Sequence, residues 1–375
     1  MSKSILVIAG EASGDLHGST VIRELKKRDP DLKCFGIGGD RMRAAGMELL
    51  YHVRDVSFIG FSEVVRHIPT FRRIFKHLTA ECRNRSADMV LLIDYPGFNL
   101  RFGAKVKKMG VPVFYYIAPQ VWAWHQSRAR KMASFVDKMA VIFDFEVTFF
   151  REYGIDAEFV GHPLLDGLEL EMQKSEFLEA YELSTDQPLL GLFPGSRRQE
   201  IEHLLPVMLQ TADQLREQNP KLQVAVSQAE TIDKEQLLQI REYPYVKTVV
   251  GHTYDLMNAS DAAIVASGTA TLETACFGTP FILAYQVSSV SYHIGLHLVK
   301  LPYIGLVNIV ANEEVAREFI QMDLQPDEMA AHLKPLLYDE LVRSETIDKL
   351  SAVREKLGKA GAAEKTATLI LGMFS

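Results

Sequence analysis

The sequence predicts an α/β protein in which two Rossmann-like domains face a cleft, and three observations support this prediction. The chain has 375 residues, 47% of them hydrophobic and 24% charged, which fits two hydrophobic cores better than one. Short apolar runs alternate with helical patterns, as in a parallel sheet with crossover helices. The alternation starts again after a polar helical stretch in mid-chain. We therefore expect one domain over residues 1–165, a second over 166–340 and a helical segment over 341–375.

The predicted strands are short apolar runs, each ending where Gly, Pro or polar residues begin. In the first domain they are residues 5–9, 34–37, 89–93, 113–117, 138–142 and 158–160. In the second domain they are residues 189–193, 223–226, 247–250, 262–266 and 280–284. Parallel strands place their carboxyl ends at one edge of the sheet, where open α/β sheets bind ligands. The loops after these strands therefore hold the candidate binding residues.

Charge and cysteine content argue against several classes of protein. The net charge of −7 disfavours a nucleic-acid binder, because phosphate backbones are bound by clustered Lys and Arg. Cys34, Cys82 and Cys276 lack the spacing of a zinc site or a disulfide framework, so we expect a cytoplasmic protein with no metal and no cofactor. The apolar run at residues 5–9 is too short for a signal peptide, and no apolar stretch reaches the roughly 18 residues of a membrane span.

The loop over residues 10–18 follows the first predicted strand and opens the first helix. It matches neither the dinucleotide fingerprint nor the P-loop. Glu11 and Asp15 would repel a diphosphate, so the loop, with Ser13 and Gly14, suits the hydroxyl groups of a sugar or another acceptor better. The alternative, an ordinary turn in which Ser13 or Asp15 caps the helix, stays open.

A second strand-to-helix loop contains Gly195, Ser196, Arg197 and Arg198. Backbone amides at a helix start bind anions, and an arginine can clamp a phosphate with two hydrogen bonds. We expect a diphosphate here, with Arg197 stabilising the charge on a departing phosphate group. The alternative is a pair of arginines on a solvated helix start.

A third loop, with Ser267, Gly268 and Thr269, leads into a helix that carries Glu273. Small residues let a ligand approach the backbone, and the helix start can face a phosphate. Glu273 lies one turn into the helix and can accept hydrogen bonds from a ribose diol. A solvated glutamate is the open alternative.

Asp94 ends a predicted buried strand just before Pro96. A half-buried carboxylate there can have a raised pKa and act as a general base, or it can simply organise the turn. Trp122 and Trp124, the only tryptophans of the chain, can stack on a sugar or line an apolar channel, or they can lie in the core.

Residues 60–85 alternate apolar side chains with Arg and Lys in an otherwise acidic protein. Such a segment can rest on an anionic bilayer and admit acyl chains, and an ordinary amphipathic helix explains it equally well. The chain lacks the zinc-protease and serine-hydrolase motifs. Its only Asp-x-Asp run, residues 29–31, follows a helix away from the binding edge, which disfavours metal-dependent sugar transfer.

Taken together, these motifs resemble the lipid-A-disaccharide synthase family, metal-independent glycosyltransferases of the two-Rossmann GT-B architecture. The resemblance extends over the whole chain. The matching runs are residues 9–15, 93–99, 121–124, 159–163, 194–197 and 266–269 with Glu273. Each run is unspecific alone, and the set is highly specific.

The resemblance implies transfer of a 2,3-diacylglucosamine unit from UDP-2,3-diacylglucosamine to 2,3-diacylglucosamine 1-phosphate, with a β-1,6 linkage and inversion. It implies Asp94 as the base, Arg197 at the diphosphate, Glu273 at the ribose and Asn308 near the donor. Some members carry an acid where this chain has Gly97, which leaves Asp94 as the only carboxylate of that turn. Both substrates are lipids, so we expect peripheral contact with the inner membrane through residues 60–85, and a homodimer stays open.

Two other functions stay open at this point. A UDP-sugar 2-epimerase shares the architecture but needs no lipid surface. A non-catalytic lipid- or nucleotide-binding module would keep the phosphate loops without needing Asp94. A nicotinamide dehydrogenase is disfavoured because the glycine fingerprint is missing.

Overall fold

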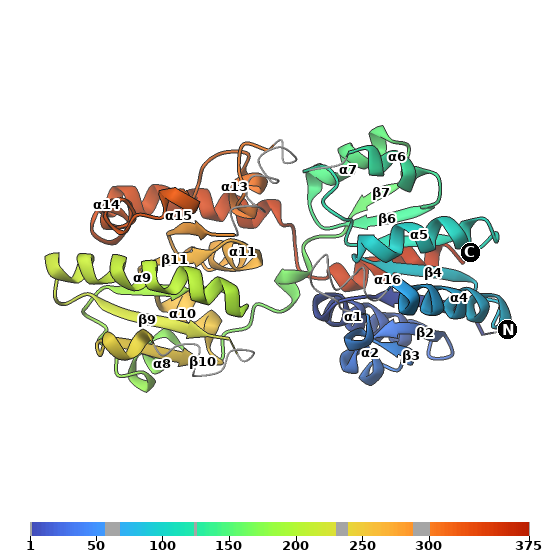
Figure 1. Ribbon diagram of the computed structural model, residues 1–375, viewed down its shortest axis with the longest axis horizontal. Coiled ribbons are helices and arrows are strands. Elements are labelled where there is room, and N and C mark those ends of the chain that lie inside the picture. The colour runs from blue at the N-terminus through green and yellow to red at the C-terminus, as the bar shows by residue number, and fades with distance from the viewer. Residues whose placement is uncertain (1, 57–67, 124–125, 230–238, 288–300, 375) are drawn as a thin grey trace. The chain divides into compact units, whose positions relative to one another are not determined.

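The computed structural model describes residues 2–56, 68–123, 126–229, 239–287 and 301–374. The chain forms two compact units, each built on a parallel sheet (Figure 1). Unit 1 comprises Met1–Asp166 and Leu357–Ser375, and unit 2 comprises Gly167–Lys356. The predicted fold class, two Rossmann-like domains with parallel sheets, is confirmed.

Unit 1 has a seven-stranded sheet in the order β3-β2-β1-β4-β5-β6-β7. Its strands are β1 (Ser4–Ala9), β2 (Lys33–Gly38), β3 (Glu48–His52), β4 (Met89–Ile93), β5 (Val113–Tyr116), β6 (Lys138–Val141) and β7 (Ala157–Phe159). Its helices are α1 (Ala12–Arg28), α2 (Asp40–Ala44), α4 (Ile68–Asn84), α5 (Pro96–Lys107), α6 (Ser127–Ala133), α7 (Asp144–Glu152) and α16 (Ala362–Gly372).

The sheet of unit 1 is buried on both faces, because side chains alternate along each strand. On β1, Leu6 and Ile8 belong to the core formed with α4 and α5. Their neighbours Ile5 and Val7 belong to the opposite core, formed with α1 and α16. This explains why the strand reads as an unbroken apolar run.

Unit 2 has a six-stranded sheet in the order β10-β9-β8-β11-β12-β13. Its strands are β8 (Leu189–Phe193), β9 (Gln223–Gln228), β10 (Val246–Val250), β11 (Ala262–Ala266), β12 (Phe281–Tyr285) and β13 (Glu318–Ile320). Its helices are α8 (Lys174–Ala180), α9 (Arg198–Gln218), α10 (Thr253–Ala259), α11 (Thr269–Cys276), α13 (Leu306–Ala311), α14 (Pro326–Tyr338) and α15 (Glu340–Lys356). Apolar residues of α9 and α14 pack with alternate residues of β8 in one core.

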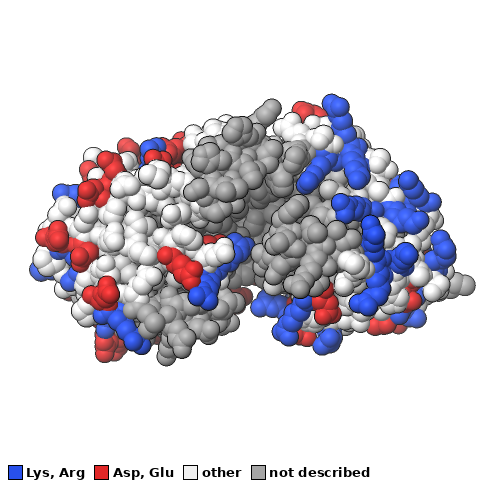
Figure 2. Space-filling model, viewed as in Figure 1, with Lys and Arg blue, Asp and Glu red and all other residues white. Residues whose placement is uncertain are grey.

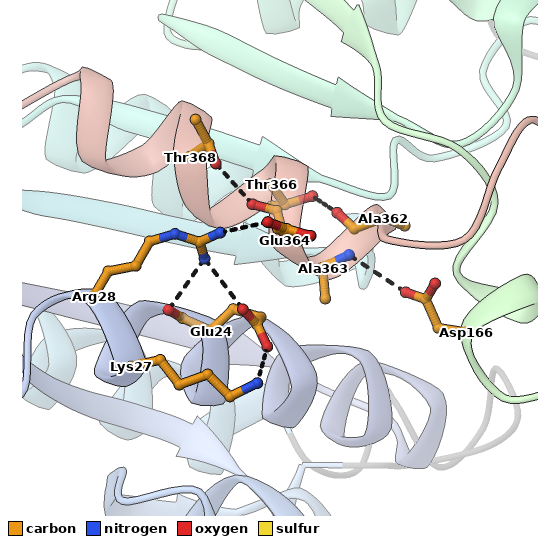
Figure 3. Close-up of polar contacts among 9 residues, drawn as sticks. All are labelled: Glu24, Lys27, Arg28, Asp166, Ala362, Ala363, Glu364, Thr366 and Thr368. Atoms are coloured by element: carbon orange, nitrogen blue, oxygen red, sulfur yellow. Dashed lines mark hydrogen bonds and ion pairs between the residues drawn. The ribbon is translucent and has the colours of Figure 1, made fainter.

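The last helices of the chain belong to different units. The sequence predicted one helical segment over residues 341–375, whereas α15 lies in unit 2 and α16 returns to unit 1. The start of α16 is held by the Asp166 carboxylate, which accepts hydrogen bonds from the Gly361 amide at 2.5 Å and the Ala363 amide at 3.4 Å. Arg28 of α1 pairs with Glu364 at 3.1 Å (Figure 3). These contacts attach the end of the chain to α1.

Candidate functional site

Both sheets reverse their strand order at one position, and the predicted loops lie there. In unit 1 the reversal falls between β1 and β4, and in unit 2 between β8 and β11. Ligands of open α/β sheets bind at this switch point, beyond the carboxyl ends of the strands. The loops after β1 and β4 carry Glu11 and Asp94, while those after β8 and β11 carry Arg197 and Ser267. Each unit therefore has its own candidate site.

The Tyr95 ring lies against the backbone of Gly10 at the switch point of unit 1. Ala9 and Ile93 are paired in neighbouring strands, so the residues that follow them lie side by side. A Cβ on residue 10 would lie 2.2 Å from the ring of Tyr95, so only glycine fits. The Tyr95 hydroxyl donates to the Val56 carbonyl at 2.8 Å, which fixes the ring across the loop.

Asp94 adopts a left-handed backbone conformation with φ of 43°, which is rare for a residue other than glycine and concentrates at functional sites. Its carbonyl oxygen accepts hydrogen bonds from Asn99 Nδ2 at 2.8 Å and Tyr115 Oη at 2.7 Å. These bonds stabilise the strained turn. The Asp94 side chain lines a cavity of about 270 Å³.

Burial, with a smaller contribution from the neighbouring carboxylate of Glu11, raises the pKa of Asp94 to about 6, and the hydrogen bond from the Tyr95 amide opposes this rise. A carboxylate with this pKa is ionised near neutral pH and is more basic than an ordinary aspartate. Glu11 and Ser13 are exposed, and Gly14 is buried. The structure thus brings Glu11 of the first loop close to Asp94.

Asp15 has a different role from the predicted ligand contact. Its buried carboxylate accepts hydrogen bonds from the backbone amides of Gly39, Arg41 and Met42 at 2.7, 3.2 and 3.0 Å. These amides start α2 and need an acceptor. Asp15 is therefore a helix cap, as in the alternative interpretation of this loop, but it caps α2 and not α1, the helix that contains it.

Trp122 is a core residue. It is 7% exposed, its ring packs edge-on against Phe145 with centroids 5.0 Å apart, and its Nε1 donates to Glu146 at 2.9 Å. A buried indole whose N–H is already bonded cannot offer its face to a sugar. The expected stacking role of Trp122 is therefore not supported, and Trp124 lies outside the described residues.

The sequence interpretation missed several residues of this cavity. Glu146 is 1% exposed and accepts the Trp122 indole together with the amides of Ile142 and Phe143, at 3.2 and 3.1 Å. Burial raises its pKa to about 7, and these hydrogen bonds oppose the rise. Gln120 and Arg128 also line the cavity. Gln120 and Glu146 closely follow predicted strands, which was the detectable signal, whereas Arg128 lies farther along the chain on α6.

The switch point of unit 2 opens into a cavity of about 400 Å³. Most of the predicted donor residues line it: Gly195, Ser196, Arg197, Ser267, Gly268, Thr269 and Glu273. Gly195 has φ of 101°, and a Cβ there would lie 2.3 Å from Glu200 Oε2, so this turn requires glycine. The loops after β8 and β11 thus expose backbone at the starts of α9 and α11.

Arg197 and the start of α9 surround one carboxylate. Glu200 accepts hydrogen bonds from the Ser196 and Arg197 amides, both at 3.2 Å, and from Arg197 Nη1 at 2.7 Å. Two amides and a guanidinium are the donors that bind a phosphate oxygen. The Arg197 side chain is 78% exposed and lines the cavity. Arg198 instead pairs with Glu202 at 2.6 Å and does not line the cavity.

Glu273 lies in the first turns of α11 and is half-buried. Burial raises its pKa, while a hydrogen bond of 3.2 Å from Tyr254 Oη lowers it. Its other oxygen can accept hydrogen bonds from a diol.

Asn308 is held by the protein and has a different role from the predicted donor contact. Its Nδ2 donates to the Ala316 carbonyl and to Glu318, at 2.7 and 2.9 Å, and its Oδ1 accepts the amides of Val315 and Ala316. An amide side chain offers two donors and two acceptor sites, and all four are used. Asn308 is fully buried and anchors the chain after α13.

The described part of residues 60–85 comprises the whole of α4 and Arg85, and α4 packs on the core of unit 1. Ile74, Leu78 and Cys82 are buried there. Cations occupy the opposite face and continue on α5, where Figure 2 shows them gathered. This α4–α5 basic face consists of Arg72, Arg73, Lys76, Arg83, Arg101, Lys105 and Lys108. No helix in the described ranges combines the length and apolarity needed to cross a bilayer.

Comparison with solved structures agrees with the fold. The UDP-GlcNAc 2-epimerase of Neisseria meningitidis, solved with UDP-GlcNAc, has a TM-score of 0.67 at 12% identity, over 98% of this chain and 100% of that one. A calicheamicin glycosyltransferase has a TM-score of 0.63 at 15% identity, over 99% and 98% of the two chains. These likenesses show that the fold is that of GT-B glycosyltransferases and related epimerases.

Sequence comparison shows which family of this fold the chain matches. The family model described as lipid-A-disaccharide synthetase matches residues 5–370. The lipid-A-disaccharide synthase of Syntrophus aciditrophicus (strain SB) is 43% identical over 100% of this chain and 98% of its own length. That of Trichlorobacter lovleyi is 42% identical over 99% and 97%. The chain therefore belongs to the lipid-A-disaccharide synthase family of glycosyltransferases.

Proposed function

We propose that this glycosyltransferase joins UDP-2,3-diacylglucosamine to 2,3-diacylglucosamine 1-phosphate, releasing UDP and forming a β-1,6-linked disaccharide 1-phosphate. Membership of the family supports a lipid A disaccharide product. The donor is α-linked and the product β-linked, so a single displacement with inversion is the simplest chemistry. No metal and no cofactor take part in the proposed reaction.

The cavity of unit 2 is the proposed donor site. Its cationic and amide groups, Arg197 and the starts of α9 and α11, suit the diphosphate of UDP. Glu273 suits the ribose hydroxyls. When the bond between the sugar C1 and the phosphate oxygen breaks, negative charge collects on UDP, and Arg197 stabilises it.

Asp94 is the proposed general base, and its geometry is the observation that carries the proposal. It takes the proton of the acceptor 6-hydroxyl while that oxygen attacks the sugar C1. The strained turn aims a carboxylate with a pKa of about 6 into the cavity of unit 1. A raised pKa would serve no purpose in an aspartate that only organised its turn, whereas it suits a group that accepts a proton. The negative charge of Glu11 disfavours the ionised form of Asp94 and so makes Asp94 a stronger base.

The substrates are lipids, so the protein is proposed to work as a peripheral protein at the cytoplasmic face of the inner membrane. The α4–α5 basic face supports contact with an anionic bilayer. In the described part of residues 60–85, cations and not large apolar side chains are exposed for this contact. A homodimer stays open.

A transfer assay tests the proposal. The protein is incubated in detergent with both substrates and with EDTA, and the product linkage is read by NMR. We expect a β-1,6 disaccharide and free UDP. Binding of both substrates without any disaccharide would refute the proposal. Conversion of a UDP-sugar to its C2 epimer would favour the epimerase instead.

A further inference from the structure

Glu146 is a buried acid that the proposed chemistry leaves unused, although it lies in the wall of the cavity that holds the proposed base. Five consecutive residues after β5, 117–121 (the cavity loop), line this cavity of unit 1, and Ile142 and Phe143 line it after β6. Asp94 lines it from the end of β4. Glu146 lies on α7, lines the same cavity and is 1% exposed.

The two oxygens of the Glu146 carboxylate bond to different segments of the cavity wall. Oε1 accepts the indole Nε1 of Trp122 at 2.9 Å, and Trp122 directly follows the cavity loop. Oε2 accepts the backbone amides of Ile142 and Phe143 at 3.2 and 3.1 Å. The Phe145 ring strengthens the same connection, because it lies edge-on against Trp122 and stacks on Phe143, with centroids 5.0 and 5.5 Å apart. Glu146 thus joins the end of the cavity loop to the end of β6.

The cavity loop begins in a conformation that needs support from its surroundings. Ile117 has φ of 58°, a left-handed backbone that is rare for a β-branched residue and persists only when the surrounding structure holds it. Its amide donates to the Ala140 carbonyl of β6 at 3.2 Å. The carbonyl of Tyr116, just before it, accepts the amide of Asp94 at 3.1 Å. The loop therefore starts beside Asp94, and Glu146 holds its other end.

This arrangement requires a side chain whose two oxygens both accept hydrogen bonds. A carboxyl group keeps acceptor capacity on both oxygens whether or not it is ionised, whereas glutamine has one acceptor oxygen and one donor NH₂ group. E146Q would turn that NH₂ group either toward the indole N–H of Trp122 or toward the two backbone amides. A buried donor that loses its acceptor destabilises the arrangement that contains it.

We infer that Glu146 is a positioning residue: by bonding Trp122 to the end of β6, it keeps the cavity loop in the form that takes the acceptor sugar beside Asp94. This inference rests on the proposed function. Glu146 acts through the cavity loop and not by contact with the reacting atoms. Trp122 then serves the site as an anchor in the core and not as a surface on which a sugar stacks.

The test is a double-mutant cycle of E146Q and W122F. Calorimetry in detergent gives the dissociation constants for 2,3-diacylglucosamine 1-phosphate and for UDP, and steady-state assays give kcat and the acceptor KM. E152Q is the matched control, because Glu152 is an exposed acid of the same helix. Circular dichroism shows whether each variant is folded. W122F removes the same hydrogen bond from the other side, so it tests the inference even if E146Q does not fold.

We expect E146Q, and W122F alone, to weaken acceptor binding and raise the acceptor KM by about 5- to 100-fold, because the cavity loop then holds its binding form in a smaller fraction of molecules. UDP binding and kcat at saturating acceptor should change little, and E152Q should resemble the native protein. In the W122F background the indole N–H is gone, so the glutamine can turn its oxygen to the two amides. There E146Q should add less than about threefold.

Three results would overturn the inference. The first is unchanged acceptor binding by a folded E146Q or W122F. The second is an equal loss of acceptor and UDP binding, which would mean a general loss of structure. The third is an E146Q effect of the same size in both backgrounds, which would exclude the bond to Trp122 as the cause. If the native protein binds the acceptor and forms no disaccharide, the proposed function fails, while the binding ratios still decide whether Glu146 shapes the cavity.

Discussion

The two aspartates that flank β4 differ in what their ionisation does to the folded protein. Burial raises the pKa of Asp94 to about 6, so keeping it charged at neutral pH costs stability. Burial alone would also raise the pKa of Asp88, but hydrogen bonds from Ser4 and Lys3 together lower it. Charged Asp88 therefore stabilises the folded state, and this contribution is lost as the pH falls through its lowered pKa.

D94N should raise the melting temperature at pH 7 because it removes a charge that the fold disfavours. D88N should lower it because it weakens two favourable contacts. The gain from D94N should disappear below about pH 4, where the native aspartate is protonated in both the folded and unfolded states. Thermal unfolding by circular dichroism at several pH values checks both. A lower melting temperature for D94N at pH 7 would argue against the raised pKa.

Glu200 accepts both loop amides and the Arg197 guanidinium, the groups that the proposed function assigns to the diphosphate. E200Q keeps an acceptor there and removes the negative charge. We expect UDP to bind roughly 3- to 10-fold more tightly, since one repulsive charge near the diphosphate is gone.

Calorimetric titration with UDP measures this change, and E202Q is the control because Glu202 pairs with Arg198 away from the cavity. Weaker UDP binding by E200Q would mean instead that the Glu200 charge is needed to orient Arg197.

At the residue scale, the sequence predicted which loops line the cavities better than the direction of the side chains in them. Asp94, Arg197 and Glu273 all line cavities at the switch points. Asp15 bonds instead to backbone amides 24 or more residues away. Asn308 bonds to backbone groups of Val315 and Ala316 and to the Glu318 carboxylate. No local pattern reveals such partners, because they are set by how separate elements pack.

At the scale of elements, the attachment of α16 depends on a carboxylate from outside the helix. Asp166 satisfies two amides at its start. D166A should destabilise the protein by about 1 kcal/mol, as for a lost helix cap, and D166N should restore most of the loss because asparagine also caps well. Urea unfolding, with hydrogen exchange of α16, measures both. Equal stability of D166A and the native protein would show that packing alone holds the helix.

The α4–α5 basic face gives a second prediction at this scale. Each Lys or Arg near an anionic membrane contributes about 1 kcal/mol, so R72E/R73E/K76E should reduce binding to vesicles containing phosphatidylglycerol by at least roughly 100-fold. Vesicle co-sedimentation measures the binding. The control K221E/R241E/K334E changes exposed cations of unit 2. An equal loss in both triple variants would mean that only net charge matters.

Strong apolar runs predicted most strands, and the two missed strands have weak patterns. β3 lies at an edge of its sheet, and most of its residues are half-buried. β13 lies at an edge of the other sheet and has three residues, one of them a glutamate. Edge strands need less apolar surface, because one side meets solvent or a loop. Periodicity therefore detects the central strands and the edge strands β7 and β10, and it misses β3 and β13.

At the scale of the whole molecule, the sequence predicted two parallel-sheet units but not the return of the chain to the first. The helical pattern of α16 shows which face is apolar, and it does not show which sheet that face covers. Its residues Ala363, Ala367 and Ile370 pack in the same core as β1. The core of unit 1 is therefore completed by a helix that follows all of unit 2 in the sequence.

The proposed function depends on Asp94 acting as the base of a sugar transfer, and the pH dependence of kcat/KM for disaccharide formation tests this most directly. The base must be ionised, and burial raises its pKa to about 6. We therefore predict that kcat/KM is constant above about pH 7 and falls close to tenfold per pH unit below pH 6. D94N should lose at least roughly 100-fold in rate and lack this acidic limb. A D94N variant that keeps the native rate and profile would contradict the account.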